Sequence, residues 1–262
     1  MMLEHQLPLS DNKKIVHVLN GDALLERFPT TIPGLRIVAR EALAEGPLGG
    51  NTLKAFFDGR ATYLNDKYGA PSSFYYQQTV TEFQRLQGID KDAQVFLWFE
   101  DDVFCQLNCW FVTYLLVHSG HSGSCFVVRP PNHTPYSFGS LDESALLNCF
   151  HNKPLLLLDT IQVAQLWQKL SIGDFDAATQ CAAILPKEYH FLQSALKAYL
   201  EAFPGKGQPG RPKSALIRIV ADLKTSDFSS VFREFSNREP IYGYSDLQVM
   251  RLLDELKADA LI

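Results

Sequence analysis

The chain has little cysteine, no net positive charge and no long apolar run, and each absence excludes a class of protein. Its 5 cysteines include no Cys-x-x-Cys pair, so we expect a reducing compartment without a disulfide framework or a zinc knuckle. The net charge of −5 gives no electrostatic reason for broad nucleic-acid or membrane binding. No stretch approaches the ~18 consecutive apolar residues of a membrane span, and residues 1–8 lack the regions of a signal peptide. We therefore expect a soluble, cytoplasmic protein.

The glycine-rich motifs of nucleotide enzymes are also absent. Neither a Walker A sequence nor Gly-x-Gly-x-x-Gly occurs, so classical nucleoside-triphosphate or dinucleotide binding has no support. Residues 120–124, Gly-His-Ser-Gly-Ser, resemble a nucleophile elbow, but the final glycine is missing and the serine precedes an expected strand. A surface loop is the simpler interpretation of this segment.

Short apolar runs of strand type alternate with helical patterns in the first half of the chain. The pattern predicts a parallel sheet with helices on both faces, a Rossmann-like α/β domain over residues 1–140. We expect strands at 15–20, 35–40, 94–99 and 125–128, and helices near 22–28, within 52–87 with a break at 69–71, and at 103–117, the last apolar nearly all round.

Past residue 131 the strand signal disappears and the remaining chain has helical periodicity. The loop 130–140 is a plausible boundary, which places an all-helical domain at 141–262. An amphipathic stripe covers 189–203, and a helix at 245–257 opens with the capping-box pattern Ser-Asp-Leu-Gln. Three short helices at the end of the chain fit a helix-turn-helix or winged-helix module.

Acidic residues follow three of the expected strands. Asp22 comes after the first strand, Glu41 after the second, and Glu100 and Asp102 after the third. In an open parallel sheet, ligands bind in the crevice outside the carboxyl ends of the strands. We therefore expect these side chains to lie along one edge of the sheet.

Several carboxylates at one edge repel each other unless a cation, an arginine or a raised pKa relieves the repulsion. A hard ion such as Mg²⁺ takes carboxylate and phosphate oxygens as ligands, which predicts a phosphate-containing small molecule and metal-assisted phosphoryl or phosphodiester chemistry. The predicted metal ligands and catalytic residues are Asp22, Glu100 and Asp102, with Asn20, Gly21, Arg40, Glu41 and Gln106 as further ligand contacts.

Structural roles explain the same residues equally well at this stage. Asp22 could simply cap the helix that follows it, and Asp101 or Asp102 could cap the helix at 103–117, because aspartate is a preferred N-cap residue. Arg40 could form an ordinary ion pair with a carboxylate. An enzyme and a protein without catalytic activity both remain open.

A second hypothesis places the function in the helical tail. Residues 205–213 are rich in glycine and proline, and four basic residues lie between 206 and 218 without an acid. Arg211 and Lys213 could contact DNA in the manner of minor-groove arms. The alternatives are a plain linker and a regulatory protein that binds a protein partner.

Five sequence segments resemble a known family. They are 16–24 (VHVLNGDAL), 40–47 (REALAEGP), 97–106 (LWFEDDVFCQ), and the tail pieces around 200–204 and 239–246. They look like the signature blocks of the family called domain of unknown function 1835, whose members are mostly bacterial. The resemblance implies an α/β domain joined to a helical one, and it implies no activity. The common form has histidine where Asp101 stands and aspartate where Cys105 stands, and 211–215 departs from the usual tail sequence.

Overall fold

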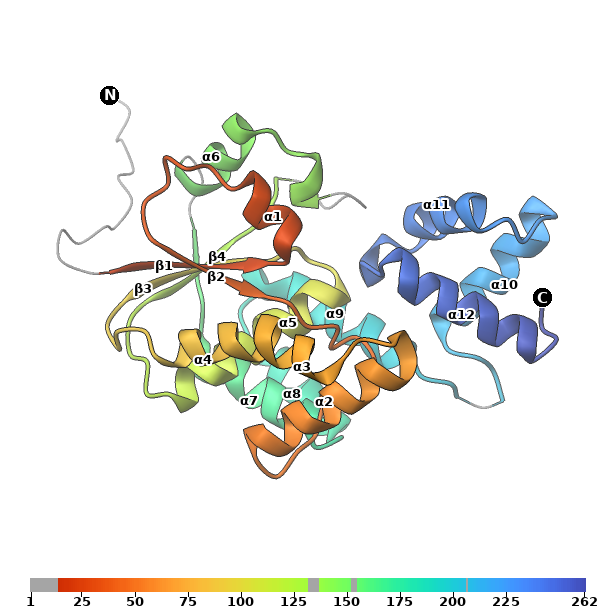
Figure 1. Ribbon diagram of the computed structural model, residues 1–262, viewed down its shortest axis with the longest axis horizontal. Coiled ribbons are helices and arrows are strands. Elements are labelled where there is room, and N and C mark those ends of the chain that lie inside the picture. The colour runs from red at the N-terminus through yellow and green to blue at the C-terminus, as the bar shows by residue number, and fades with distance from the viewer. Residues whose placement is uncertain (1–13, 132–136, 152–154, 206) are drawn as a thin grey trace.

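The protein is built around a five-stranded, mostly parallel sheet, seen edge-on in the computed structural model (Figure 1). The described residues are 14–131, 137–151, 155–205 and 207–262. The strand order is β2-β1-β3-β4-β5. The first four strands pair in parallel and β5 is antiparallel to β4. The strands are β1 (Ile15–Asn20), β2 (Leu35–Ala39), β3 (Gln94–Trp98), β4 (Cys125–Val128) and β5 (Leu156–Leu157).

The four strands predicted from the sequence are confirmed, and the prediction that no strand follows residue 131 is wrong. Two residues, Leu156 and Leu157, pair with β4 and are too few to show any periodicity in the sequence. The sheet therefore extends past the boundary predicted at residue 140. Residues 1–8, for which we predicted no signal peptide, and part of the predicted boundary loop 130–140 lie outside the described residues.

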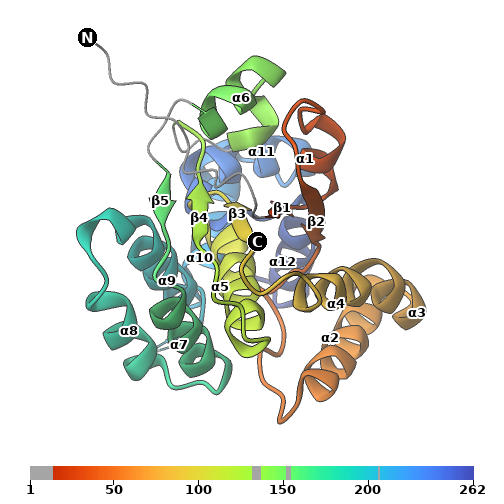
Figure 2. The ribbon, with the colours of Figure 1, turned by 90° about the vertical axis from the view of Figure 1, so that its left-hand side faces the viewer.

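Helices cover both faces of the sheet, as the alternating pattern predicted (Figures 1 and 2). Two of them, α1 (Asp22–Arg27) and α6 (Glu143–His151), lie on one face. The opposite face carries the long helices that follow β2, β3 and β5. These are α2 (Leu53–Tyr68), α3 (Ser72–Tyr75), the π-helical turn η1 (Tyr76–Val80), α4 (Thr81–Gln87), α5 (Val103–His118), α7 (Thr160–Ser171), α8 (Phe175–Ala183) and α9 (His190–Glu201), with the 3₁₀ turn η3 (Lys187–Tyr189) before α9. The 3₁₀ turn η2 (Ser137–Ser140) contacts α1 on the first face.

Two apolar layers sandwich the sheet because successive side chains of a strand point to opposite faces. On β3, Phe96 and Trp98 join the layer under α1 and α6, whereas Val95 and Leu97 join the larger layer under α5. The prediction of a helix buried nearly all round is confirmed in α5, which packs against α4, α7 and α9.

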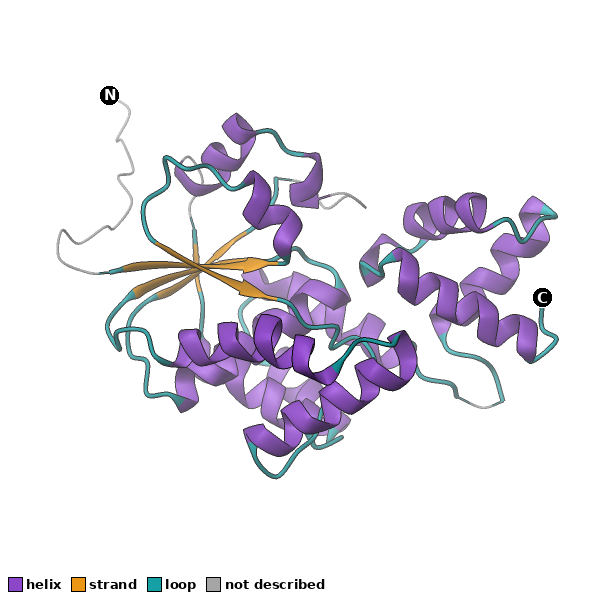
Figure 3. Cartoon of the chain, in the orientation of Figure 1, coloured by secondary structure: helices purple, strands orange, loops and turns teal. Residues whose placement is uncertain are grey.

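The last three helices form a separate bundle, which we call the C-terminal unit. It consists of α10 (Arg211–Leu223), α11 (Phe228–Arg238), the 3₁₀ turn η4 (Pro240–Tyr242) and α12 (Asp246–Ala258). The predicted capping box at Ser245 and Gln248 is confirmed. The unit lies beyond the carboxyl ends of the strands (Figures 1 and 3). Its helix-turn-helix or winged-helix character stays a prediction.

The described segments contain no helix with both the length and the apolar composition needed to cross a bilayer.

His17 lies at the centre of the sheet and makes stability dependent on pH. Trp98 Nε1 donates to His17 Nδ1 at 3.1 Å, and His17 Nε2 donates to the Pro33 carbonyl at 3.1 Å. Complete burial lowers the pKa of His17 from 6.5 to about 4. Because the unfolded chain binds a proton at a higher pH than the folded chain does, stability is lost as the pH falls from 6.5 towards 4.

We expect His17 to reduce the free energy of unfolding by about 2 kcal/mol between pH 7 and pH 5. Urea unfolding at the two pH values measures this term as the difference between the wild-type protein and His17→Gln. Other titrating groups cancel in that comparison, and His190→Gln, at an exposed position, serves as the control. An equal loss in all three proteins would contradict the prediction.

Candidate functional site

The order of the strands has a topological switch point between β1 and β3. After β1 the chain builds β2 on one side of it and β3 on the other. Such a change of direction opens a crevice between the two strands, where ligands bind in open α/β sheets. Asn20 ends β1, and Glu100 lies two residues beyond the end of β3.

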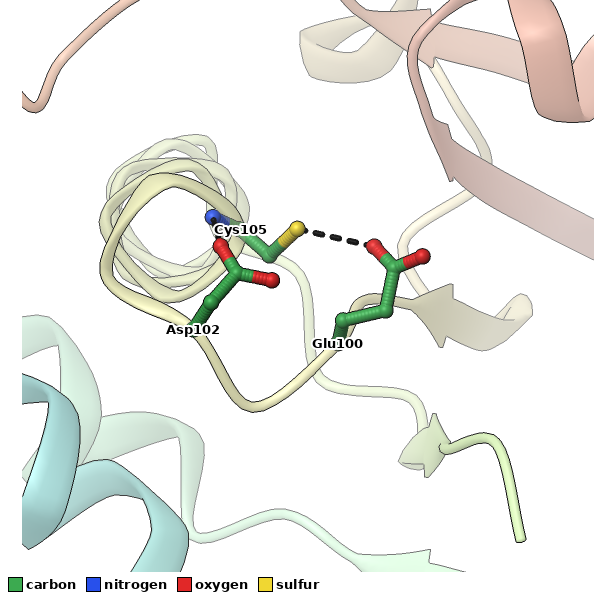
Figure 4. A group of neighbouring side chains, drawn as sticks. All are labelled: Glu100, Asp102 and Cys105. Atoms are coloured by element: carbon green, nitrogen blue, oxygen red, sulfur yellow. Dashed lines mark hydrogen bonds between the residues drawn. The ribbon is translucent and has the colours of Figure 1, made fainter. Parts of the chain in front are cut away.

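Three potential metal ligands gather at this crevice. Glu100, Asp102 and Cys105 each offer one ligand atom, and these atoms all lie within 4.8 Å of one another (Figure 4). Glu100 and Asp102 belong to the connection between β3 and α5, and Cys105 belongs to the first turn of α5. The spacing Glu-x-Asp therefore brings both carboxylates to one place, as predicted from the sequence.

The start of α5 explains why the thiol joins the two carboxylates. Asp102 is the N-cap residue of α5, and its Oδ1 accepts the backbone N–H of Cys105 at 2.9 Å. The third residue of a helix turns its side chain back towards the N-cap, which places the Cys105 thiol beside Asp102. The thiol donates to Glu100 Oε2 at 2.8 Å (Figure 4), and Glu100 Oε1 accepts the N–H of Phe138 at 3.1 Å.

Neutral amide side chains form hydrogen bonds to the cluster and to one another. Asn20 Nδ2 donates to Cys105 Sγ at 2.9 Å, and Asn108 Nδ2 lies 3.5 Å from Asn20 Oδ1. Gln106 Nε2 donates to the backbone carbonyl of Glu100 at 2.6 Å, which fixes the loop that carries the carboxylate. Of the predicted ligand contacts, Asn20 and Gln106 thus support the cluster through these bonds.

Burial determines the protonation of the cluster. Asp102 and Cys105 are 5% and 4% exposed, and Glu100 is half-buried. Desolvation, followed by the charge of Glu100, raises the pKa of Asp102 to about 7. Desolvation also raises the pKa of the Cys105 thiol well above its ordinary value, with the two carboxylates adding to the effect. A cation at this position would relieve the repulsion and displace these protons.

The structure pairs Asp22 with Arg40 instead of placing it in this cluster. Arg40 Nη2 lies 2.7 Å from Asp22 Oδ1, and Arg40 Nη1 donates to the Gln78 carbonyl at 2.8 Å. Among the described residues, Asp22 is not part of the group whose ligand atoms reach one another. Gly21, not Asp22, is the N-cap residue of α1. The ion pair considered for Arg40 is therefore present.

Glu41 is engaged in a separate buried network. Its Oε1 accepts Arg60 Nη2 at 2.8 Å and Arg60 Nε at 3.1 Å, and its Oε2 accepts the Tyr75 hydroxyl at 2.5 Å. The side chains of Glu41 and Arg60 are both fully buried. Arg60 further donates to the carbonyls of Ala42 and Glu45. The network fixes the loop after β2, so we interpret Glu41 as a structural residue.

The basic residues considered for DNA binding form ion pairs within the protein. Arg211 lies 2.8 Å from both Glu201 and Glu239, and Lys213 Nζ lies 3.0 Å from Glu255. These pairs offset the charge that phosphate contacts would use. The DNA-binding or partner-binding alternative stays a prediction.

Cys105 is the residue of the cluster that the sequence prediction missed. A cysteine in an apolar helix is typical of a small buried hydrophobe. The usable signal was its position, because Cys105 stands three residues after an aspartate that could cap the helix.

In comparisons with known proteins, no family model, no curated protein and no solved structure matches the chain. The resemblance to domain of unknown function 1835 accordingly stays a prediction.

Proposed function

We propose that the protein binds one divalent transition-metal ion at the carboxyl edge of its sheet through Glu100, Asp102 and Cys105. The observation that carries this proposal is the approach of their three ligand atoms to within 4.8 Å of one another. The location in the crevice between β1 and β3 supports it, because this is the usual ligand site of an open α/β sheet.

The thiol favours Zn²⁺ over the Mg²⁺ expected from the carboxylates alone. Mg²⁺ takes oxygen ligands and keeps several of its waters. Zn²⁺ binds thiolate, imidazole and carboxylate ligands, and thiolate sulfur selects softer ions. Asn20 donates to the Cys105 sulfur and would orient a thiolate ligand, as polar neighbours of metal ligands commonly do.

The donor set suits a catalytic ion better than a structural one. Structural zinc sites use four protein ligands, whereas catalytic sites use three and leave a position for water or substrate. A zinc ion held by these three residues would supply Lewis-acid chemistry and lower the pKa of a bound water. The predicted phosphate-containing ligand and the phosphoryl or phosphodiester chemistry fit such an ion and stay predictions.

We expect the purified protein to bind one equivalent of Zn²⁺ and to bind Mg²⁺ far more weakly. Cys105→Ser and Glu100→Gln should each weaken Zn²⁺ binding at least about 100-fold, because each removes a direct ligand. Equilibrium dialysis with metal analysis at pH 7.5 measures the stoichiometry and the affinity.

Two variants outside the cluster serve as matched controls. Cys181→Ser removes a more exposed thiol, and Asp22→Asn removes the carboxylate that pairs with Arg40. Both should bind Zn²⁺ like the wild-type protein. Wild-type affinity in Cys105→Ser would contradict the proposal, and so would a loss in Asp22→Asn equal to the loss in Glu100→Gln.

A further inference from the structure

Burial of the cluster raises the question of how an ion would reach it. Asp102 and Cys105 are almost completely buried, and part of the cover of Asp102 comes from the C-terminal unit. The turn η4 packs against both α5 and α9. The residue after η4, Gly243, lies directly against the Asp102 carboxylate.

The backbone conformation at position 243 and the lack of space there both favour glycine. Its φ of 60° lies in the left-handed region that glycine adopts without strain. A Cβ atom on Gly243 would lie 2.2 Å from Asp102 Oδ1 and 2.5 Å from its Cγ. Asp102 Oδ1 also accepts the backbone N–H of Cys105 at 2.9 Å, so a shift of this short side chain would disturb the cap of α5. Gly243 is itself exposed to solvent, so the cover over Asp102 is thin at this point.

Polar contacts attach this cover to the rest of the protein. The Tyr242 hydroxyl donates to the Ala198 carbonyl at 3.0 Å. Arg211 joins Glu201 at the end of α9 to Glu239, the residue before η4. Tyr242 is fully buried, whereas the Arg211 and Glu201 side chains are partly exposed and their ion pair can exchange with water. Local opening of a short segment costs less free energy than global unfolding.

We infer that the C-terminal unit controls access to the Glu100–Asp102–Cys105 cluster, through the contact of Gly243 with Asp102. Opening of the segment around η4 exposes the Asp102 carboxylate and the Cys105 thiol, and closing buries them again. This inference rests on the proposed function, because opening and closing of this segment would regulate entry and release of the metal ion.

Alkylation of Cys105 measures access without any metal. We expect Gly243→Ala to raise the rate at which iodoacetamide modifies Cys105 at least about fivefold, because a methyl group at 243 forces the cover away from Asp102. Mass spectrometry locates the modified cysteine in the full-length protein. Cys109, one turn further along α5 and equally buried, reports general loosening of the fold.

A matched glycine and a second variant complete the experiment. Gly69 has a φ of 67° with no atom near an added Cβ, so Gly69→Ala carries the same backbone strain and should leave Cys105 unchanged. Arg211→Gln should also raise Cys105 modification, because it loosens the cover without touching the cluster. An unchanged rate in Gly243→Ala and Arg211→Gln would overturn the inference, as would equal gains at Cys109.

The metal readout separates this inference from the proposed function. Added Zn²⁺ should protect Cys105 in the wild-type protein, and Zn²⁺ should associate faster with Gly243→Ala. Faster alkylation of Gly243→Ala without any protection by Zn²⁺ would refute the metal site and support control of access by the C-terminal unit. Protection of Cys105 by Zn²⁺, with identical alkylation and Zn²⁺ association rates in every variant, would support the metal site and refute control of access by the C-terminal unit.

Discussion

Asp102→Asn is expected to make the metal-free protein more stable and to abolish its Zn²⁺ binding. The carboxylate is almost completely buried beside Glu100, and burial raises its pKa from 3.8 to about 7. Asparagine keeps the shape and the acceptor that caps α5, but it removes the buried charge. The variant should lose Zn²⁺ affinity at least about 100-fold, because it lacks one direct ligand.

The gain in stability has a defined pH dependence. A carboxyl group with a folded pKa above its unfolded pKa favours the folded state when it is protonated, and this advantage is lost as the pH rises from about 4 to about 7. At pH 8 the ionised, buried Asp102 therefore opposes folding. We expect Asp102→Asn to raise the free energy of unfolding by about 2–4 kcal/mol at pH 8 and by almost nothing near pH 4.

Asp174→Asn is the matched control for this prediction. Asp174 caps α8 in the same way, accepting the N–H of Ala177, but it is exposed. Its replacement should change stability by less than about 0.5 kcal/mol at either pH. Urea unfolding at pH 4 and pH 8 without metal measures all three proteins. A loss of stability in Asp102→Asn at pH 8 would show that Asp102 is not held as an unfavourable charge.

Arg60→Met should lower the free energy of unfolding by about 3–5 kcal/mol. This is the largest loss of stability that we expect from a single substitution. Among the described residues, the change leaves the buried Glu41 carboxylate with the Tyr75 hydroxyl and the Ala42 N–H as its donors. It also removes the guanidinium that binds the carbonyls of Ala42 and Glu45. Chemical denaturation at pH 7.5 measures the loss.

Two further variants show that the cost comes from the unpaired buried charge. Arg40→Met breaks the more exposed pair with Asp22 and should cost about 1 kcal/mol or less. The double variant Arg60→Met/Glu41→Leu removes both buried charges and should recover a substantial part of the loss. Equal costs for Arg60→Met and Arg40→Met would contradict the structural role that we give to Glu41.

The sequence predicted much of the fold because local patterns specify it. The four longer strands are mostly apolar runs bounded by turn residues, and α5 is apolar nearly all round, so their burial follows largely from composition. The strand β5 could not be predicted, because Leu156 and Leu157 become a strand only by pairing with β4. The capping box at Ser245 could also be predicted, because its two residues lie only three positions apart in the sequence.

The candidate site was predicted in part, and the errors concern partners distant in the sequence. Glu100 and Asp102 come together because a single residue separates them at a bend. Arg60, which pairs with Glu41, belongs to α2 and lies 19 residues away. No local sequence pattern near Glu41 predicts this pairing. Gly243 meets Asp102 only after the C-terminal unit docks, which no local pattern could indicate.

The X-ray absorption spectrum of the zinc-loaded protein tests the central claim most directly, because it identifies the atoms around the metal. We predict one sulfur at about 2.3 Å and oxygen neighbours at about 2.0–2.2 Å, with the sulfur signal lost in Cys105→Ser. A first shell without sulfur, or an unchanged spectrum in that variant, would show that Glu100, Asp102 and Cys105 do not hold the ion together.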